Sequence, residues 1–334
     1  MSTARPCCPV CHGSGDTQYT DVVDVYFGAS GRWDIRRCVN DACGLWWLDP
    51  MPSQSANEDV YDGYFTRVVE TVRAAGFKQL IERGILAGSF GYALGVPAAW
   101  RVLGRVLGLL PAARDEAARR IMWLPRSRAG VLLDVGCGSG TLLQRMRSLG
   151  WQVRGVEPDQ RAAAIARDHH SLQVHCGTLL SYAARDGEFD AITLNHVIEH
   201  VPDPVEFIRE CSRILRPGGW LVVVTPNVLS LGRRVFGRYW RGLEVPRHLS
   251  LFAPKSLTQL LRGTSLRIVQ LRTPARSARW MWATSSAARS GAAPRRGLRA
   301  LSSASAAWLF QLVEHAATAI APVGEEILLI VTKD

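Results

Sequence analysis

Lysine is almost absent from this 334-residue chain, which has 40 Lys and Arg residues but only three lysines, Lys78, Lys255 and Lys333. All the other cations are arginines, whose planar guanidinium groups make forked contacts with phosphate and carboxylate. Acids are missing from residues 245–313, where eleven Lys or Arg stand against no Asp or Glu, equal to the formal net charge of +11. This segment is either a solvated basic face or a surface for anionic lipid heads, phosphorylated substrate or nucleic acid.

The sequence also lacks an uninterrupted membrane-spanning run, and residues 84–100 come nearest to one. These seventeen residues carry no charge, but Gly88, Gly91, Gly95 and Pro97 interrupt them. A spanning helix needs about twenty mostly apolar residues. We expect helices over residues 68–125, and two interpretations stay open: a helical lid packed on the core, or an interfacial hairpin on a bilayer with arginines at head-group level.

We expect no secretory signal in the first residues, because they are polar and include cysteines. We therefore expect a cytoplasmic protein, with peripheral attachment to the inner face of the membrane as a further option. The cysteine pattern agrees, since four of the eight cysteines cluster before residue 39 and a fifth is Cys43. Such clustering suits a metal site in a reducing compartment better than a disulfide framework.

Two short-spaced cysteine pairs, Cys8 with Cys11 and Cys38 with Cys43, flank a segment that alternates enough to form a small hairpin over residues 19–35. Two such knuckles supply the four thiolates of a tetrahedral zinc site. Four protein ligands leave no open position for substrate, so the predicted Zn²⁺ is structural. Cys7 and His12 are spare candidate ligands.

A glycine-rich turn follows the apolar residues 131–135, which predict a buried strand, and precedes a predicted helix at 139–149. The dinucleotide fingerprint needs its third glycine one residue after Gly140, where this chain has Thr141. Asp134 would repel a pyrophosphate but suits an ammonium group. Glu157 ends the next strand, where an acid can accept hydrogen bonds from ribose hydroxyls. Ammonium and ribose without pyrophosphate favour S-adenosylmethionine over NAD.

These residues resemble motif I (134–140) and motif II (157) of the class I S-adenosylmethionine-dependent methyltransferases. The resemblance covers residues 129–272 and the last strand. It implies an α/β, Rossmann-like, seven-stranded doubly wound sheet of order 3-2-1-4-5-7-6 with the last strand antiparallel. The cofactor contacts that it implies are Asp134, Gly136, Cys137, Gly138, Gly140, Glu157, Pro158, Thr178, Leu179, Asn195 and His196. Relatives often hold the adenine amino group with an acid near residues 177–181, which this chain lacks, so backbone groups or Ser181 would serve.

The expected domains are a zinc ribbon (1–50), a helical linker and lid (51–128) and the methyltransferase core (129–334) with a basic helical insertion at about 273–324. Zinc-ribbon methyltransferases acting on sugars and related substrates show a similar order. By that resemblance Tyr61 and Tyr64 cap the methionine moiety or the substrate, and ordinary aromatic packing is the alternative.

Candidate bases follow the predicted fourth strand, at the edge of the sheet where substrate and cofactor should meet. In the sugar methyltransferases that the chain resembles, a Glu-His pair here carries base chemistry, which maps onto Glu199 and His200. The alternative is that the pair only shapes the loop. His248 is a second candidate base and Arg247 a candidate clamp for an acidic substrate, whereas packing of a lid is the alternative for this loop.

The favoured function is methyl transfer to oxygen, nitrogen or carbon of a small molecule or glycan, including lipid-linked or phosphorylated acceptors. An RNA methyltransferase using the basic face is an alternative, weakened by the lack of an Asn/Asp-Pro-Pro-aromatic motif and of catalytic-cysteine motifs. A non-catalytic adaptor is another, and the intact Asp134, Gly136 and Glu157 argue against it. Residues 245–313 are the candidate contact with an anionic membrane surface.

Overall fold

The computed structural model describes residues 3–52, 76–291 and 298–334, the last with backbone alone up to residue 304. Tyr61 and Tyr64 lie outside the described residues. The chain divides into two compact units. The first comprises residues 1–62, 196–209 and 223–330, and the second comprises residues 63–195, 210–222 and 331–334.

A seven-stranded sheet has the order β10-β11-β8-β7-β4-β5-β6. Numbered by their order in the chain, these strands run 6-7-5-4-1-2-3, so the predicted strand order is confirmed. Its strands are β4 (Val131–Val135), β5 (Gln152–Glu157), β6 (Val174–Cys176), β7 (Phe189–Asn195), β8 (Leu215–Pro226), β10 (Leu266–Arg272) and β11 (Glu326–Lys333). Strand β4 pairs in parallel with both β5 and β7. The carboxyl ends of these three strands therefore meet at one edge, where ligands bind in doubly wound sheets.

Helices between these strands bury their apolar residues against the sheet. Between β5 and β6, α6 begins where the Asp159 side chain accepts hydrogen bonds from the backbone N–H groups of Arg161 and Ala162. Its alanines pack with Leu143 of α5 and with the start of β6. The helices of this group are α5 (Thr141–Ser148), α6 (Gln160–Asp168), α7 (Pro204–Ile214) and α9 (Pro254–Leu260).

A second, four-stranded sheet has the order β1-β2-β3-β9. The hairpin expected near residues 19–35 is present as β1 (Gly15–Val22) paired antiparallel with β2 (Trp33–Cys38). Strand β3 (Trp46–Asp49) continues the sheet and pairs with β9 (Ser250–Leu251). The N-terminal cysteine-bearing segment is thus completed by a strand from much later in the chain, which the sequence did not predict.

The remaining helices include those of the expected insertion, α10 (Ala278–Ser290) and α11 (Leu298–Thr318). Trp282 of α10 packs edge to face on Phe236 and also contacts the ring of Phe310 in α11. In the part of the chain that the structure describes, no helix is long and apolar enough to cross a membrane. The other short helices are α8 (Leu231–Phe236) and the 3₁₀ turns η2 (Arg119–Ile121), η3 (Arg126–Arg128), η4 (Leu179–Ser181), η5 (Ile198–His200) and η6 (Gly237–Tyr239).

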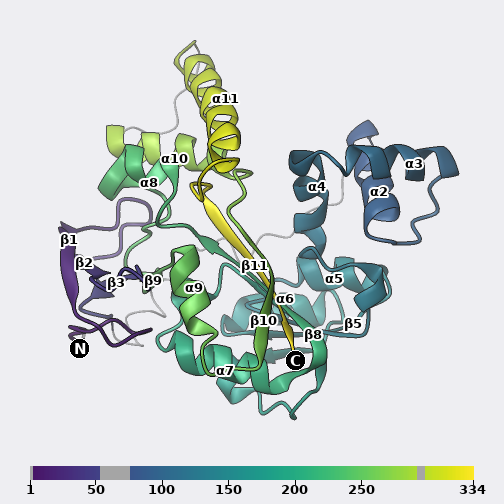
Figure 1. The fold of residues 1–334 in the computed structure, drawn as a ribbon, viewed down its shortest axis with the longest axis horizontal. Helices are drawn as coiled ribbons and strands as arrows, with labels where there is room; N and C mark the ends of the chain where they lie inside the picture. The colour runs from purple at the N-terminus through teal and green to yellow at the C-terminus, as the bar shows by residue number, and fades with distance from the viewer. Residues whose placement is uncertain (1–2, 53–75, 292–297) are drawn as a thin grey trace. The chain divides into compact units, whose positions relative to one another are not determined.

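The helices expected before the core are α2 (Phe77–Ser89), α3 (Ala98–Leu107) and α4 (Pro111–Ala118). Helices α2 and α3 lie side by side (Figure 1) and meet through glycine. A Cβ on Gly104 would lie 2.0 Å from the Gly84 carbonyl carbon, and one on Gly88 would lie 2.4 Å from the Arg101 oxygen. The two backbones are therefore in direct contact, an arrangement that only residues without a side chain permit.

We expect Gly104→Leu to destabilise this helix pair. The new side chain would overlap the backbone of Gly84, so the helices would have to separate, which typically costs about 1–3 kcal/mol for an overpacked contact. Thermal unfolding followed by circular dichroism measures the change in Tm. Val106→Leu, on an exposed position of the same helix, should leave Tm unchanged, and an equal loss in both variants would contradict the glycine contact.

Candidate active site and metal centre

The predicted glycine turn joins the end of β4 to the start of α5. Gly136, Gly138 and Gly140 have φ values of 71°, 54° and 85°, in the left-handed region where glycine is favoured. The N–H of Gly136 donates to the carbonyl of Val156 in β5 over 2.7 Å. The turn is therefore held against the neighbouring strand, with Gly136 exposed and Gly138 and Gly140 buried.

Asp134 lies in β4 just before this turn. Its side chain is buried, with 4% of the residue exposed, and the Thr193 hydroxyl donates to Oδ1 over 2.7 Å. Burial, with a smaller contribution from the nearby Glu157, raises the pKa of this carboxyl to about 7 against the lowering effect of the Thr193 hydrogen bond. An ammonium group next to Asp134 would offset the cost of burying its charge, so the residue fits the amino-acid end of S-adenosylmethionine.

Glu157 ends β5, the neighbour of β4, and is equally buried. The N–H of Gly138 donates to Oε2 over 2.7 Å, and the N–H of Asp159 donates to Oε1 over 2.9 Å. Burial raises the pKa of this carboxyl against these two hydrogen bonds. The carboxylate is fixed in orientation by the backbone on both sides of it, and its remaining lone pairs can accept from ribose hydroxyls.

Further predicted cofactor residues lie in the loop that follows β6. Gly177 follows β6, and its N–H donates to the backbone carbonyl of Glu157, which brings the loop with Thr178 and Leu179 next to motif II. Ser181, the candidate adenine contact, already accepts from the Thr178 N–H and bonds His175 Nε2 over 3.0 Å. Cys137 and Leu179 are buried, whereas Pro158, Thr178 and Asn195 are exposed.

The three candidate bases come together. One ligand atom from each of Glu199, His200 and His248 lies within 4.8 Å of the others, and the two imidazole rings meet edge to face at 4.8 Å between centroids. The η5 turn carries Glu199 and His200. His248 stands in the loop before β9, and Leu249 N–H donates to the Glu199 carbonyl over 2.8 Å. Pairing of β9 with the N-terminal sheet thus helps to place His248.

Both histidines use Nδ1 as a donor, since each faces a backbone carbonyl that can only accept. His200 Nδ1 lies 2.9 Å from the Arg247 oxygen, and His248 Nδ1 lies 2.8 Å from the Gly242 oxygen. Burial lowers the pKa of each imidazole to about 4. At neutral pH both rings are therefore uncharged, with the lone pair on Nε2, the protonation state that a general base requires.

Glu199 is fully buried and ionised. His196 Nδ1 donates to Oε1 over 3.0 Å, and the Thr225 hydroxyl donates to Oε2 over 2.9 Å. Burial alone would raise its pKa, but the His196 hydrogen bond and charge lower it to about 2. The carboxylate can therefore stabilise positive charge that forms on a neighbouring imidazole.

His196, predicted to contact the cofactor, lies between two carboxylates, with Nε2 3.4 Å from Glu326 Oε1. Although burial opposes the charged form, Glu199 and Glu326 raise its pKa to about 10, so the ring is an imidazolium. Arg276 pairs with Glu326 on the other side at 2.8 Å. The sequence did not predict that Glu326 and Arg276 lie near His196. The only sequence signal was that Glu326 is an acid at the start of an apolar strand.

Arg247 is buried and engaged within the protein. Its Nη1 donates to Asp24 Oδ2 over 2.9 Å, and its guanidinium lies 4.1 Å from the centroid of the Phe27 ring. Asp24 also accepts from the N–H groups of Tyr26 and Ala29. A clamp on an acidic substrate would have to break this ion pair, so the observed contacts favour a role in holding the loop of residues 24–29.

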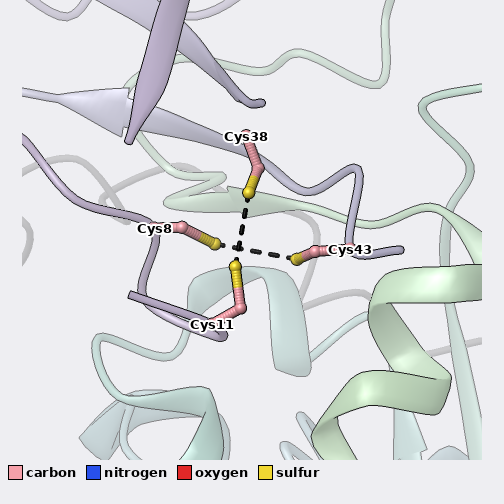
Figure 2. A group of neighbouring side chains, drawn as sticks. All are labelled: Cys8, Cys11, Cys38 and Cys43. Carbon is pink, nitrogen blue, oxygen red and sulfur yellow. Dashed lines mark hydrogen bonds between the residues drawn. The ribbon is translucent and has the colours of Figure 1, made fainter. Parts of the chain in front are cut away.

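Four cysteines form a compact group at the edge of β2, with Cys38 as its last residue and the others in the adjoining loops (Figure 2). The sulfur atoms of Cys8 and Cys43 are 3.7 Å apart and those of Cys11 and Cys38 are 3.3 Å apart, and all four lie within 4.8 Å of one another. Four thiolates at the Zn–S distance of about 2.3 Å in a tetrahedron would have sulfurs about 3.8 Å apart. The geometry therefore fits a structural zinc ion, with the spare candidates Cys7 and His12 outside the group.

The sheet order, the glycine turn and the two buried acids define a Rossmann-like protein of the methyltransferase type. Residues 110–271 match the family model described as "Methyltransferase domain". This part of the chain is therefore a methyltransferase domain, as predicted.

Named relatives agree over the same region. The chain is 32% identical over 155 residues to the ubiquinone biosynthesis O-methyltransferase of Burkholderia ambifaria, covering 42% of this chain and 66% of that protein. It is 38% identical over 102 residues to that of Thiobacillus denitrificans, covering 29% and 44%. The chain thus spans just under two thirds of the first relative's length.

Among solved structures, a SAM-dependent methyltransferase from Archaeoglobus fulgidus is similar with 17% identity, a TM-score of 0.45 and coverage of 67% of this chain and 93% of that one. The [4+2]-cyclase SpnF is similar with 22% identity, a TM-score of 0.44 and coverage of 80% and 99%.

Proposed function

We propose that this protein transfers a methyl group from S-adenosylmethionine to an oxygen of a small-molecule acceptor. The observation that carries the proposal is the pair of buried carboxylates, Asp134 and Glu157, on adjacent parallel strands beside a glycine turn. Within a methyltransferase domain this pair matches the two ends of the donor: Asp134 would hold the ammonium group and Glu157 the ribose hydroxyls. When bound, the donor supplies an electrophilic methyl group on a sulfonium.

The residues of this chain then have to orient the acceptor and remove its proton. An alcohol or phenol becomes a competent nucleophile as its proton moves to a base during attack. His200 and His248 are neutral and carry their lone pair on Nε2, so either can accept that proton. The ionised Glu199 beside them stabilises the imidazolium that results. The choice of oxygen as acceptor atom follows the names of the relatives, which are O-methyltransferases.

The matched variants His200→Gln and His248→Gln test the base. We expect one of them to lower kcat by about a hundredfold or more, as is typical for loss of a general base, while S-adenosylmethionine binding is unchanged. Release of S-adenosylhomocysteine from a panel of small phenols and sugars measures the rate, and isothermal calorimetry measures donor binding. Wild-type kcat in both variants would overturn the assignment.

The pH profile gives a second readout. Because the pKa values of both histidines lie near 4, kcat at saturating donor should show no loss near pH 6.5, where an ordinary histidine is protonated. An acid limb at that pH in the wild type, removed in one glutamine variant, would contradict the neutral state.

We also propose that Cys8, Cys11, Cys38 and Cys43 hold a structural Zn²⁺. Support comes from the four sulfurs within 4.8 Å of one another and from the two knuckles that present them. In one knuckle the His12 N–H donates to the Cys8 carbonyl, and in the other the Cys43 N–H donates to the Asn40 carbonyl. A closed set of four thiolates has no open position, so the ion would stabilise this sheet rather than take part in methyl transfer.

A further inference from the structure

Helix α3 carries an exposed apolar stripe. Its side chains recur at the spacing of one helical face and continue past the end of the helix. The members are Val102, Leu103, Val106, Leu109 and Leu110, of which Leu109 is 78% exposed and Val102 65% exposed. Phe77, at the start of the adjacent α2, is 72% exposed and meets the Trp100 ring edge to face. Exposed apolar surface of this extent marks an interaction site.

The glycine contact explains why these side chains are exposed. At about 100° per residue, Gly104 points toward α2, and Val102 and Val106 lie on the opposite side of the helix. The helix pair is held by close backbone packing at Gly84, Gly88 and Gly104 and by the Phe77–Trp100 ring contact, and neither uses the side chains of the stripe. The apolar side chains of the stripe are therefore not needed to hold the pair together and remain exposed on its outer face.

The segment of the chain that carries the stripe has charge of a single sign. Residues 83–114 contain no Asp or Glu but four arginines. Arg101 and Arg105 are exposed on α3 and precede Val102 and Val106 by one residue, so they border the stripe along its length. An apolar face bordered by cations is complementary to a bilayer with anionic head groups, since the arginines reach phosphate while the apolar side chains enter the acyl boundary.

We propose that α3, with the residues up to Leu110, is an interfacial anchor that binds the surface of bilayers rich in anionic phospholipid. The anchor lies in the plane of the membrane and does not cross it, in agreement with α3 being only 10 residues long. The inference is independent of the proposed methyl transfer. It gives such an enzyme access to acceptors that reside in or leave a membrane.

Vesicle flotation of the full chain tests the anchor. The vesicles are phosphatidylcholine alone or phosphatidylcholine with about a third phosphatidylglycerol. We expect the wild type to bind the anionic vesicles. The double variant Val102→Asp with Val106→Asp should reduce the amount of bound protein by at least about tenfold. Arg101→Gln should reduce it by about fivefold, because one cation near an anionic surface contributes about 1 kcal/mol. Binding of Arg101→Gln should also lose part of its salt dependence.

The matched control is Leu309→Asp with Leu312→Asp. These residues lie on α11, are 64% and 65% exposed, and belong to the basic segment that the sequence nominated for membrane contact. Their loss should change binding less than twofold. The proposal is overturned if the wild type does not bind anionic vesicles, if the α3 double variant binds like wild type, or if only the α11 variant loses binding.

Two further measurements separate the anchor from other causes. Circular dichroism must show the same Tm for the α3 double variant as for wild type, which its exposed positions predict; the single Arg101→Gln variant gives a second test with a milder change. Analytical ultracentrifugation detects a self-association surface: if wild type is oligomeric and the α3 variant monomeric without vesicles, the stripe binds a second copy and the membrane proposal fails.

Discussion

The variant Asp134→Asn should bind S-adenosylmethionine at least about a hundredfold more weakly than wild type and yet be more stable without it. Loss of affinity follows because the amide cannot pair with the donor's ammonium group, and a buried charged hydrogen bond that is broken costs several kcal/mol. Isothermal calorimetry with the full chain measures the affinity. Asparagine keeps the shape of the side chain and an oxygen to accept from Thr193, so the effect isolates the charge.

The gain in stability follows from the sign of the pKa shift. Burial raises the pKa of Asp134 from 3.8 to about 7, so the folded state holds this proton more tightly than the unfolded state. The free energy of unfolding is therefore highest below about pH 4 and falls as the pH rises toward 7 and the buried carboxylate ionises. One pKa unit is worth about 1.4 kcal/mol, so at pH 8 asparagine should recover on the order of 2–4 kcal/mol.

Thermal unfolding at pH 5 and pH 8 measures this gain, which should be larger at pH 8. Asp168→Asn is the matched control, because Asp168 is an exposed acid at the end of α6 in the same unit. It should change neither affinity nor the pH dependence of Tm. Donor affinity at the wild-type level in Asp134→Asn would remove this residue from the cofactor site, and an unchanged Tm at pH 8 would contradict its buried charge.

Individual strands of the large sheet were predictable because their signals are local. Apolar runs that end in a glycine turn or in an acid mark β4 and β5, and the strand of residues 326–332 agrees with β11 to one residue. Buried parallel strands are nearly all apolar, so each can be recognised alone. The resemblance to methyltransferases then supplied their order, which no single strand encodes.

The pairing of β3 with β9 in the N-terminal sheet could not be predicted from the sequence. Strand β9 is only two residues, Ser250 and Leu251, too short for any periodicity, and its partner Trp46 is two hundred positions away. The pairing therefore depends on the tertiary structure alone. It also decides where the loop with His248 lies, which is why the sequence could nominate this histidine but not its proximity to His200.

The ion pairs near the candidate bases were unpredictable for the same reason. His196 follows the fourth strand of the sheet, and Glu326 begins the last, so their contact requires the register of two strands far apart in sequence. Arg247 was nominated as a substrate clamp from its residue type and place in a loop. Its partner Asp24 sits in an unpatterned connection between β1 and β2, and nothing local links the two residues.

Loss of the proposed zinc ion should have the largest effect on stability. We expect Cys11→Ser to reduce zinc from about one ion per chain to near zero, because three thiolates bind far more weakly than four, and structural zinc contributes about 10–16 kcal/mol in small domains. The sheet that the ion closes includes β9, so the loop with His248 should loosen with it. Inductively coupled plasma mass spectrometry measures the metal and circular dichroism the Tm.

Cys7→Ser is the matched control, since Cys7 is exposed, adjacent to Cys8 in the chain and outside the group of four. It should retain full zinc and wild-type Tm. A zinc chelator should reproduce the effect of Cys11→Ser on the wild type while donor binding, which uses Asp134 and Glu157, stays intact. If Cys7→Ser loses the metal and Cys11→Ser keeps it, the ligand set is wrong. If neither variant contains zinc and both have the wild-type Tm, the four sulfurs are an ordinary reduced cluster and the metal proposal fails.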